Sequence, residues 1–407
     1  EFNNFANIMF GVQDRYSYYL SADEYDTYFA ASDSFVGIGI RFESGFTAGN
    51  HIAEIIEGSP ADNAGLQAGD IIMKVDGQDV TWMTTAEIQS CINGEAGSGV
   101  DITYFRPDTN QIHSKRIVRS EISVSNISYK PLGDIAYIAI SRFGDIQTAI
   151  DFKTVYDKIK LKGVESVIID IRSNPGGSIA ALLEIMNMMI PEADVEMVSI
   201  KDRSGENTSY ITDGTGWLPE KLVMLVDGAS ASASEIFAGT MQDYGYATVI
   251  GTQTYGKGVG QYHLEMGDGA EAVLTGFELY LPKQGSYDGV GITPDEKVEL
   301  GYARVKLPDL GKLTISRGMK VGDVSEEVLG LENRLALLGY FYGAPDNVFD
   351  GETLEAVNRF QRAFDLPVVS TASTNMINNL IKQVSEYSKG LVVIDTQLER
   401  AIELLSE

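Results

Sequence analysis

The middle of this chain alternates short apolar runs with longer amphipathic stretches, and this alternation restricts the fold more than any other feature. The apolar runs are rich in β-branched and aliphatic residues, which are typical of buried strands. They lie at 136–140, 166–171 and 221–226. The amphipathic stretches, which favour helices, lie at 145–162, 179–190 and 232–243. Strands that alternate with helices pack as a sheet covered by helices, so we predict an α/β domain here.

The length of the chain and its changes of pattern predict further domains. With 407 residues it exceeds the size of one compact core. Short apolar runs bounded by Gly, Asp and Ser precede the α/β domain and predict a small β-rich module with one helix near 85–92. The predicted segments are a helical lead at 1–32, the β-rich domain at 33–118, the α/β domain at 119–306, a small helical domain at 307–385 and a terminal helix at 386–407.

Charge and cysteine content exclude several classes of protein. The chain has 58 acidic and 31 basic residues, and its net charge of -27 disfavours nucleic acid and anionic membrane surfaces as partners. Its single cysteine, Cys91, cannot form an internal disulfide and has no clustered Cys or His with which to bind zinc. We therefore expect no metal site and no cofactor.

Two features bear on the compartment in which the protein works. No run of about 18 uninterrupted apolar residues occurs in the sequence. The chain begins at Glu1, without Met and without a basic signal region. We expect the soluble part of an exported protein, located in the cell envelope or secreted, from which any targeting segment has been removed.

The β-rich domain opens on a glycine turn that consists of Gly37, Ile38, Gly39 and Ile40. Such a turn exposes backbone N–H groups in a concave nest that suits a peptide carboxylate. Glycine-punctuated stretches at 57–61 and 64–72 follow it, and together these motifs resemble the PDZ domains of proteases, which bind protein C-termini by strand addition. The alternative is that these glycines only allow the turns of a β-barrel.

A serine-rich segment at 227–235 lies between the third apolar run and its helix. Small residues at a strand-to-helix junction let a substrate backbone approach, and N–H groups at a helix start favour a developing oxyanion. Three serines compete for the role of nucleophile, namely Ser230, Ser232 and Ser234. Because serine is also a common N-cap residue, the segment alone does not separate catalysis from helix capping.

An alcohol nucleophile needs a base, and the chain offers a lysine and a histidine. Lys257 lies between glycines within 254–261, and its pKa, ordinarily about 10.4, would have to fall close to 7 before it could accept a proton at neutral pH. Of the three histidines, His51 and His113 belong to the β-rich domain. His263 therefore stays open as an alternative base.

Segments 227–235 and 254–261 together resemble the carboxy-terminal processing peptidases, in which a serine and a lysine at this spacing form the catalytic pair. The resemblance implies that Ser232 is the nucleophile, that Lys257 is the base and that Gln261 orients the lysine amine. It also implies a serine protease core of the crotonase or Clp-protease type, and further matching motifs extend it over 14–300.

One of those motifs, at 170–177, is a buried strand that runs into a glycine turn. In the family its glycine backbone helps to form the oxyanion hole, which implies donors at Gly176 or Gly177 together with the Ala233 N–H. We expect Asp170 and Arg172 to be structural and to hold the turn through hydrogen bonds.

Two positions depart from the family pattern. Asn93 stands where relatives commonly carry an arginine at the end of the PDZ helix. Arg15 replaces the usual proline of the lead segment, a change that we expect to be harmless.

The segment after the α/β domain resembles the small helical peptidoglycan-binding domain, with apolar residues at helical spacing in 331–340 and 356–361. Glu332 stands where a glutamine is usual. The resemblance implies binding to cell wall, and the alternative is a helical domain used for packing or for forming a homodimer.

The sequence thus predicts a multidomain α/β serine endopeptidase that captures free protein C-termini with its PDZ domain and cleaves envelope proteins near those ends. The expected partners are protein or peptide substrates and peptidoglycan. The alternative function is a peptide- or cell-wall-binding scaffold whose catalysis is vestigial.

Overall fold

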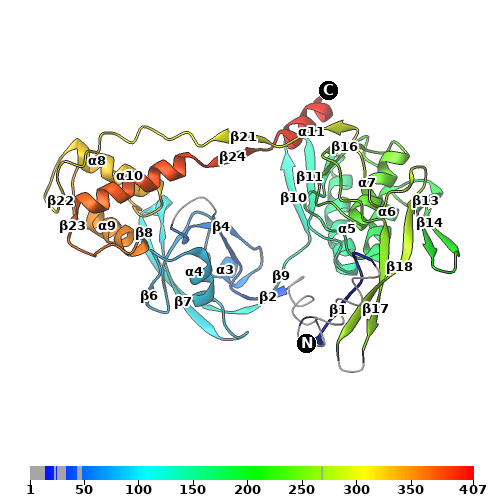
Figure 1. Cartoon of the computed structure of the whole chain (residues 1–407), viewed down its shortest axis with the longest axis horizontal. Coiled ribbons are helices and arrows are strands. Elements are labelled where there is room, and N and C mark those ends of the chain that lie inside the picture. Colours follow the sequence, from blue (N-terminus) through cyan, green and yellow to red (C-terminus); the bar gives the residue numbers. More distant parts are fainter. Residues whose placement is uncertain (1–13, 23, 25–33, 44–47, 267–268) are drawn as a thin grey trace. The chain divides into compact units, whose positions relative to one another are not determined.

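The computed structural model describes residues 14–22, 24, 34–43, 48–266 and 269–407. The chain forms two compact units and passes between them four times. The first unit comprises 1–33, 125–301 and 393–407, and the second comprises 34–124 and 302–392. Figure 1 shows both units and labels many of their helices and strands.

The α/β domain of the first unit is built on a six-stranded sheet in the order β10-β11-β12-β15-β16-β20. Its strands are β10 (Ile127–Leu132), β11 (Ile135–Ile140), β12 (Ser166–Asp170), β15 (Lys221–Val226), β16 (Thr248–Gly251) and β20 (Glu296–Lys297). Strands β11 to β20 are parallel to their neighbours, and only β10 pairs antiparallel, with β11. The three predicted apolar runs are β11, β12 and β15, so the predicted sheet is confirmed.

Helices cover both faces of this sheet, because its central strands bury side chains on each side. On one face, Val167 and Met224 pack in a core with Phe152, Leu182 and Phe237. These three aromatic and aliphatic side chains come from the three predicted helices, which are α5 (Ile146–Leu161), α6 (Ile179–Met189) and α7 (Ala233–Asp243). On the other face, the terminal helix α11 (Thr396–Ser406) packs against β12 and β15.

The first unit has a second sheet, which the sequence patterns did not predict. Its strands are β1 (Tyr18–Leu20), β13 (Ala193–Asp202), β14 (Asn207–Asp213), β17 (Val259–Glu265), β18 (Glu271–Leu281) and β19 (Gly285–Ser286). Strand β18 is its centre and pairs antiparallel with β1, β13, β17 and β19. Through β17 this sheet carries part of the candidate active site.

The helical lead expected over 1–32 is wrong at 18–20, whereas the described residues 22 and 24 are helical. Residues 18–20 form strand β1, which pairs with 271–273 of β18. Aromatic residues such as Tyr18 and Tyr19 favour a pleated, half-buried surface, and the free edge of β18 supplies one. The remainder of the expected helix, at 1–13, 23 and 25–32, lies outside the described residues.

The second unit contains the predicted β-rich domain. Its elements are β2 (Ser34–Gly37), β3 (Ile40–Phe42), β4 (Ile52–Ile55), α3 (Pro60–Asn63), β5 (Ile71–Val75), β6 (Gln78–Asp79), α4 (Thr85–Ile92), β7 (Gly99–Arg106), the 3₁₀ turn Pro107–Thr109, β8 (Gln111–Val118) and β9 (Ser120–Ser123). The predicted helix is α4, which begins at a capping box formed by Thr84 and Glu87. Its apolar face, with Ile88 and Ile92, closes the core of the domain.

The predicted helical domain belongs to the same unit. It contains β22 (Met319–Lys320), α8 (Glu326–Leu337), α9 (Gly351–Ala363), β23 (Thr371–Ala372) and α10 (Thr374–Ser388). Where the chain passes between the units, β21 (Gly301–Arg304) and β24 (Leu391–Ile394) pair as a two-stranded ribbon. Helix α10 was not predicted, because Asn375, Asn378 and Asn379 lower its helix propensity. No helix among the described residues is long and apolar enough to cross a bilayer.

The helical domain packs directly on the β-rich domain through a buried polar contact. The Asn50 side chain donates one hydrogen bond to the Ile72 carbonyl and another, of 2.8 Å, to the Tyr342 hydroxyl. The Tyr342 ring stacks on Phe105 and lies under the Arg359 guanidinium. The two domains of the second unit are therefore joined by packing as well as by the chain.

Asp170 and Arg172 join the sheet of the first unit to its terminal helix. The Arg172 guanidinium donates to the Asp170 carboxylate at 2.6 Å and to the Asp395 carboxylate at 2.6 and 2.8 Å. Asp395 is the N-cap of α11, and the Tyr137 hydroxyl donates to Asp170. Asp170 is buried, so it needs the arginine as its counter-charge.

We predict that Arg172→Leu lowers the free energy of unfolding by about 3 to 5 kcal/mol, because it leaves the Asp170 carboxylate buried without a cation. Urea denaturation followed by circular dichroism measures the change. The matched control is Lys153→Leu, which removes an exposed ion pair with Asp157 and should change stability little. Equal, small effects of the two substitutions would contradict the structural role of Arg172.

Candidate active site

Ser232 lies at the N-cap of α7, immediately after the turn that follows β15. Its backbone has φ 57° and ψ −115°, a conformation that residues other than glycine rarely adopt. Two hydrogen bonds hold this turn, from the Ser232 N–H to the Glu235 carboxylate and from the Ala231 N–H to the Asn174 carbonyl. Strained positions of this kind concentrate at functional sites.

The structure gives the three competing serines different surroundings. The Ser230 hydroxyl is fully buried and donates to the Ile171 carbonyl at 2.8 Å. The Ser234 hydroxyl is also fully buried and donates to the Asn174 carbonyl at 3.0 Å. Ser232 is partly exposed and lines a cavity. Of the three hydroxyls, only that of Ser232 can therefore meet a substrate.

This cavity, of about 870 Å³, brings together the sequence-predicted site residues of the first unit except Ala233, which is not in its lining. Its lining includes Ser232, Lys257, Gln261, Gly176 and Gly177, and also Arg15, Tyr16, Arg142 and His263. The other two histidines, His51 and His113, belong to the second unit.

Lys257 sits on the loop before β17 with its amine held by a neighbouring amide. The Lys257 Nζ donates to Gln261 Oε1 at 2.7 Å, and Gln261 Nε2 donates to the Tyr16 carbonyl at 2.7 Å. Burial lowers the pKa of Lys257 from its ordinary value. A lower pKa is what a lysine needs if it is to accept a proton.

His263 lies two residues beyond Gln261 on the same face of β17 and lines the same cavity. Its Nδ1 is 2.6 Å from the carboxylate of Glu271, which is buried at the start of β18. The cavity therefore holds both candidate bases. Among the described residues, no group of three or more His, Cys, Asp or Glu side chains could hold a metal ion.

Glu235 is a residue of this site that the sequence patterns missed. Its carboxylate is fully buried and accepts four hydrogen bonds. The donors are the N–H groups of Ser232 (2.9 Å), Gly256 (2.6 Å) and Lys257 (2.8 Å) and the hydroxyl of Thr254 (2.6 Å). Because the Ser232 and Lys257 amides donate to the same oxygen, one carboxylate fixes the Ser232 turn and the Lys257 loop side by side. The sequence did contain one signal that could have identified Glu235. It lies three residues after the N-cap residue Ser232, which is the spacing of a capping box.

The glycine turn after β12 lies against Ser232. A Cβ on Gly176 would lie 2.8 Å from the Ser232 Cβ and 2.9 Å from the Ala233 nitrogen, so only glycine fits there. The Gly176 N–H donates to the Asn174 side chain at 2.9 Å. Within the described part of the chain, the N–H groups of Gly177 and Ala233 have no acceptor. These two N–H groups are therefore available to donate hydrogen bonds to an oxyanion.

Arg15, which replaces a proline of the family pattern, makes contacts that proline could not make. Its guanidinium donates to the Gly256 carbonyl at 3.2 Å, next to Lys257. It also lies 4.6 Å from the centre of the Tyr16 ring. The lead segment therefore contacts the loop that carries Lys257 through the Arg15 side chain.

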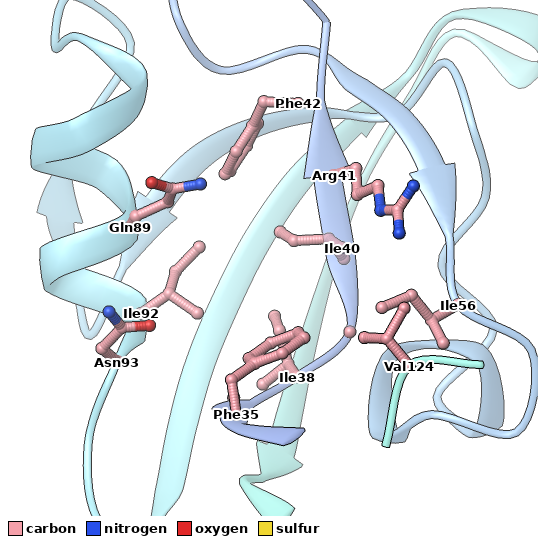
Figure 2. A pocket seen from close by; sticks show the side chains of 12 residues that line it. Phe35, Ile38, Ile40, Arg41, Phe42, Ile56, Gln89, Ile92, Asn93 and Val124 are labelled. Carbon is pink, nitrogen blue, oxygen red and sulfur yellow. The ribbon is translucent and has the colours of Figure 1, made fainter. Parts of the chain in front are cut away.

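A second pocket, of about 360 Å³, lies within the β-rich domain between β3 and α4. The predicted turn residues Gly37, Ile38, Gly39 and Ile40 line it, together with Asn93. Figure 2 shows apolar side chains around this groove, among them Phe35, Phe42 and Ile92, and shows Arg41 on the other side of the strand.

Gly39 gives the turn at this groove its shape. It has φ +86°, and a Cβ there would lie 2.2 Å from the Ser59 Cβ. Strand β3 pairs with β4 on one edge, and its other edge faces the pocket. The groove can thus accept an extended peptide beside β3.

Three segments of the chain match families of known proteins. Residues 134–298 match peptidase family S41, residues 51–105 match the PDZ domain, and residues 324–370 match a peptidoglycan binding domain.

Several curated proteins are similar over most of the chain. The carboxy-terminal processing protease CtpB of Bacillus subtilis is 30% identical over 403 residues, which cover 97% of this chain and 82% of that protein. The carboxy-terminal-processing protease of Bartonella bacilliformis is 33% identical over 73% of this chain and 69% of its own. A probable CtpA-like serine protease of Staphylococcus saprophyticus is 29% identical over 92% of this chain and 75% of its own.

We predict that Glu235→Gln lowers kcat/KM on the order of 100-fold, because the new NH₂ group faces N–H donors and displaces the serine turn from the lysine loop. It should also lower the free energy of unfolding by about 2 kcal/mol. Peptide cleavage assays and urea denaturation measure the two effects.

The matched control is Glu332→Gln in the helical domain. Glu332 is also buried, and burial raises its pKa to about 7, so an uncharged amide should replace it with little effect on cleavage. If Glu235→Gln cleaved as fast as this control, the carboxylate would not position the site.

Proposed function

Because this chain belongs to peptidase family S41, together with carboxy-terminal processing proteases, we propose that it is a serine endopeptidase that uses Ser232 and Lys257. One observation carries the proposal. Ser232 and Lys257 line one cavity, and the Lys257 amine there is partly dehydrated and bound to Gln261. A base with a lowered pKa next to a serine at a strained helix start is the arrangement that acyl transfer requires.

In the first step, neutral Lys257 removes the hydroxyl proton of Ser232 while Oγ attacks the carbonyl carbon of the scissile peptide bond. Gln261 Oε1 accepts one N–H of the amine and so leaves the lone pair of the nitrogen for the serine. The Lys257 ammonium then gives its proton to the leaving amine, and an acyl-enzyme remains on Ser232. Water hydrolyses the ester with Lys257 again as the base.

The negative charge that develops on the carbonyl oxygen needs donors near Ser232. We assign this role to the N–H groups of Ala233 and Gly177. Ala233 is the first residue of α7, so the positive end of the helix dipole adds to the effect. Gly176 supports the hole by its lack of a side chain, since its own N–H is bound to Asn174.

The PDZ groove supplies the preference for protein C-termini. The backbone of a substrate would extend the β3 edge as an added strand, and its carboxylate would bind the N–H groups of the turn at 37–40. Apolar walls formed by Phe35, Ile38 and Ile92 favour an apolar C-terminal side chain. Asn93 contributes an amide where relatives have arginine, so we assign the carboxylate to the turn.

We place this activity outside the cytoplasmic membrane, on envelope proteins, and we propose peptidoglycan as a further partner. The match of 324–370 to a peptidoglycan binding domain supports both statements. Glu332, the departure from that pattern, is buried and accepts hydrogen bonds from the Asp346 N–H and the Thr353 hydroxyl. It therefore acts inside the domain and leaves the surface free to bind a wall polymer.

We predict that cleavage increases with pH as Lys257 loses its proton, because only the neutral amine can act as base. Burial lowers the pKa of Lys257, so the increase should be centred below the value of about 10.4 for an ordinary lysine. Ser232→Ala and Lys257→Ala should each abolish cleavage of an unfolded protein and leave the fold intact.

His263→Ala is the control for this profile. It should keep the same midpoint, since His263 is paired with Glu271 and is not the base. Cleavage that survives Lys257→Ala and disappears in His263→Ala would overturn the assignment, and cleavage by neither wild type nor variant would favour a binding scaffold.

We also predict that amidation of a substrate's C-terminus weakens its binding to the groove and slows its cleavage. Gly39→Ala should weaken binding of the free-acid peptide, because the added Cβ collides with Ser59. The matched control is Gly65→Ala, which also has a positive φ but meets no atom within 4 Å. Fluorescence anisotropy measures both affinities, and equal binding of acid and amide would exclude carboxylate capture.

A further inference from the structure

The lead segment at 14–20 is tied to the central strand of the second sheet at several points. The Asp14 carboxylate accepts hydrogen bonds from the N–H groups of Tyr16 and Ser17 at 2.7 and 2.8 Å, which closes a tight turn. Thr275 of β18 donates its hydroxyl to Asp14 and its N–H to the Ser17 hydroxyl. Beyond the turn, β1 pairs with β18. Tyr16 is therefore held at a fixed place beside β17.

From that place, the backbone of Tyr16 fixes the amide of Gln261. A glutamine amide can point either its oxygen or its NH₂ group at a neighbour, and only hydrogen bonds decide between the two. The Tyr16 carbonyl accepts Nε2 at 2.7 Å, so Oε1 must face the Lys257 amine, which it meets at 2.7 Å. The rotated amide would direct N–H groups at the lysine nitrogen and occupy its lone pair.

The side chain of Tyr16 covers the same amine. The ring centre lies 5.3 Å from Lys257 Nζ, and the Arg15 guanidinium lies 4.6 Å from that centre. Arg15 in turn donates to the Gly256 carbonyl. The ring is thus held against the lysine loop, where it keeps water from the amine.

An aromatic ring beside a lysine has two opposed effects. Its face attracts the ammonium, which favours the protonated form, and its bulk removes water, which favours the neutral form. The pKa of Lys257 is lowered, and the cause is burial. This is the direction that the removal of water favours.

From these contacts, and on the basis of the proposed Ser232–Lys257 pair, we infer that Tyr16 is a positioning residue of the active site. Its carbonyl orients Gln261 toward Lys257, and its ring keeps the Lys257 amine dry. The lead segment at 14–20 is then part of the active site, although Tyr16 lies 245 positions before Gln261 in the sequence.

Other charged or titratable groups border Lys257 and must stay constant in a test of this inference. They are Arg15, Arg142, Glu235, Tyr255, His263 and Asp288. Substitution of Tyr16 alone changes none of these six residues, and Tyr16→Phe also keeps the ring on which Arg15 packs.

The test compares Tyr16→Ala with Tyr16→Phe, which keeps both the ring and the backbone carbonyl. In Tyr16→Ala, water reaches the amine, so the midpoint of the pH profile of kcat/KM should move up by about one pH unit. Cleavage near pH 7 should fall about tenfold and return to near the wild-type rate at high pH. Tyr16→Phe should behave as wild type. Glu24→Gln, an exposed change on the same segment that removes a charge but keeps an oxygen able to accept from the Ser21 hydroxyl, is the control.

A second readout does not depend on catalysis. In full-length protein with ¹³C-labelled lysine and Ser232→Ala, the Lys257 Cε signal, identified by its loss in Lys257→Ala, reports the ionisation of the amine directly. Tyr16→Ala should raise its midpoint, and Tyr16→Phe should not. An unchanged or lower midpoint in Tyr16→Ala, or a loss of cleavage that is the same at every pH, would overturn the inference. If Lys257→Ala still cleaved, the proposed function would fail instead, and the NMR titration would still decide the effect of Tyr16.

Discussion

The candidate active site depends on one buried carboxylate, that of Glu235. A carboxylate withdrawn from water is tolerated only when its oxygens accept several hydrogen bonds, and Glu235 accepts four. Those bonds come from the strained Ser232 turn and from the loop that carries Lys257. The site therefore forms when the two segments converge on Glu235, and the strain at Ser232 is offset by the bonds that fix it.

Around this centre the fold contributes three independent supports. The parallel neighbours β12 and β15 end side by side, and the turns that follow them supply Gly177 and Ser232. Helix α7 directs its first N–H groups at the same point. The second sheet brings Gln261 on β17 and the lead segment on β1 to the amine of Lys257. Each support comes from a different part of the chain, so the cavity requires the whole first unit to be folded.

The sequence predicted those parts of the molecule that have a strong local pattern. The strands β11, β12 and β15 and the helices α5, α6 and α7 follow from the spacing of apolar residues, and the same spacing predicts α8 and α9. The pair of Ser232 and Lys257 followed from resemblance, and the structure gives a physical reason to set aside Ser230 and Ser234, whose hydroxyls are bound to buried carbonyls.

What the sequence did not predict depends on contacts between distant residues. Tyr16 and Gln261 are 245 positions apart, and no local pattern links them. Strand β1 reads as helix-compatible until the free edge of β18 is present to pair with it. Glu235 carries a local capping signal, but its bonds to Gly256 and Lys257 depend on the fold.

The central claim is that Lys257 activates Ser232, and direct observation of the acyl-enzyme tests it most closely. The wild-type protein and Lys257→Met would be treated with a serine-directed acylating peptide analogue, and the modified residue would be identified by mass spectrometry of tryptic peptides. The account predicts one adduct, on Ser232, in the wild-type protein, which forms faster as the pH rises and is absent in Lys257→Met. An adduct on another serine, or equal labelling of Ser232 in Lys257→Met, would contradict it.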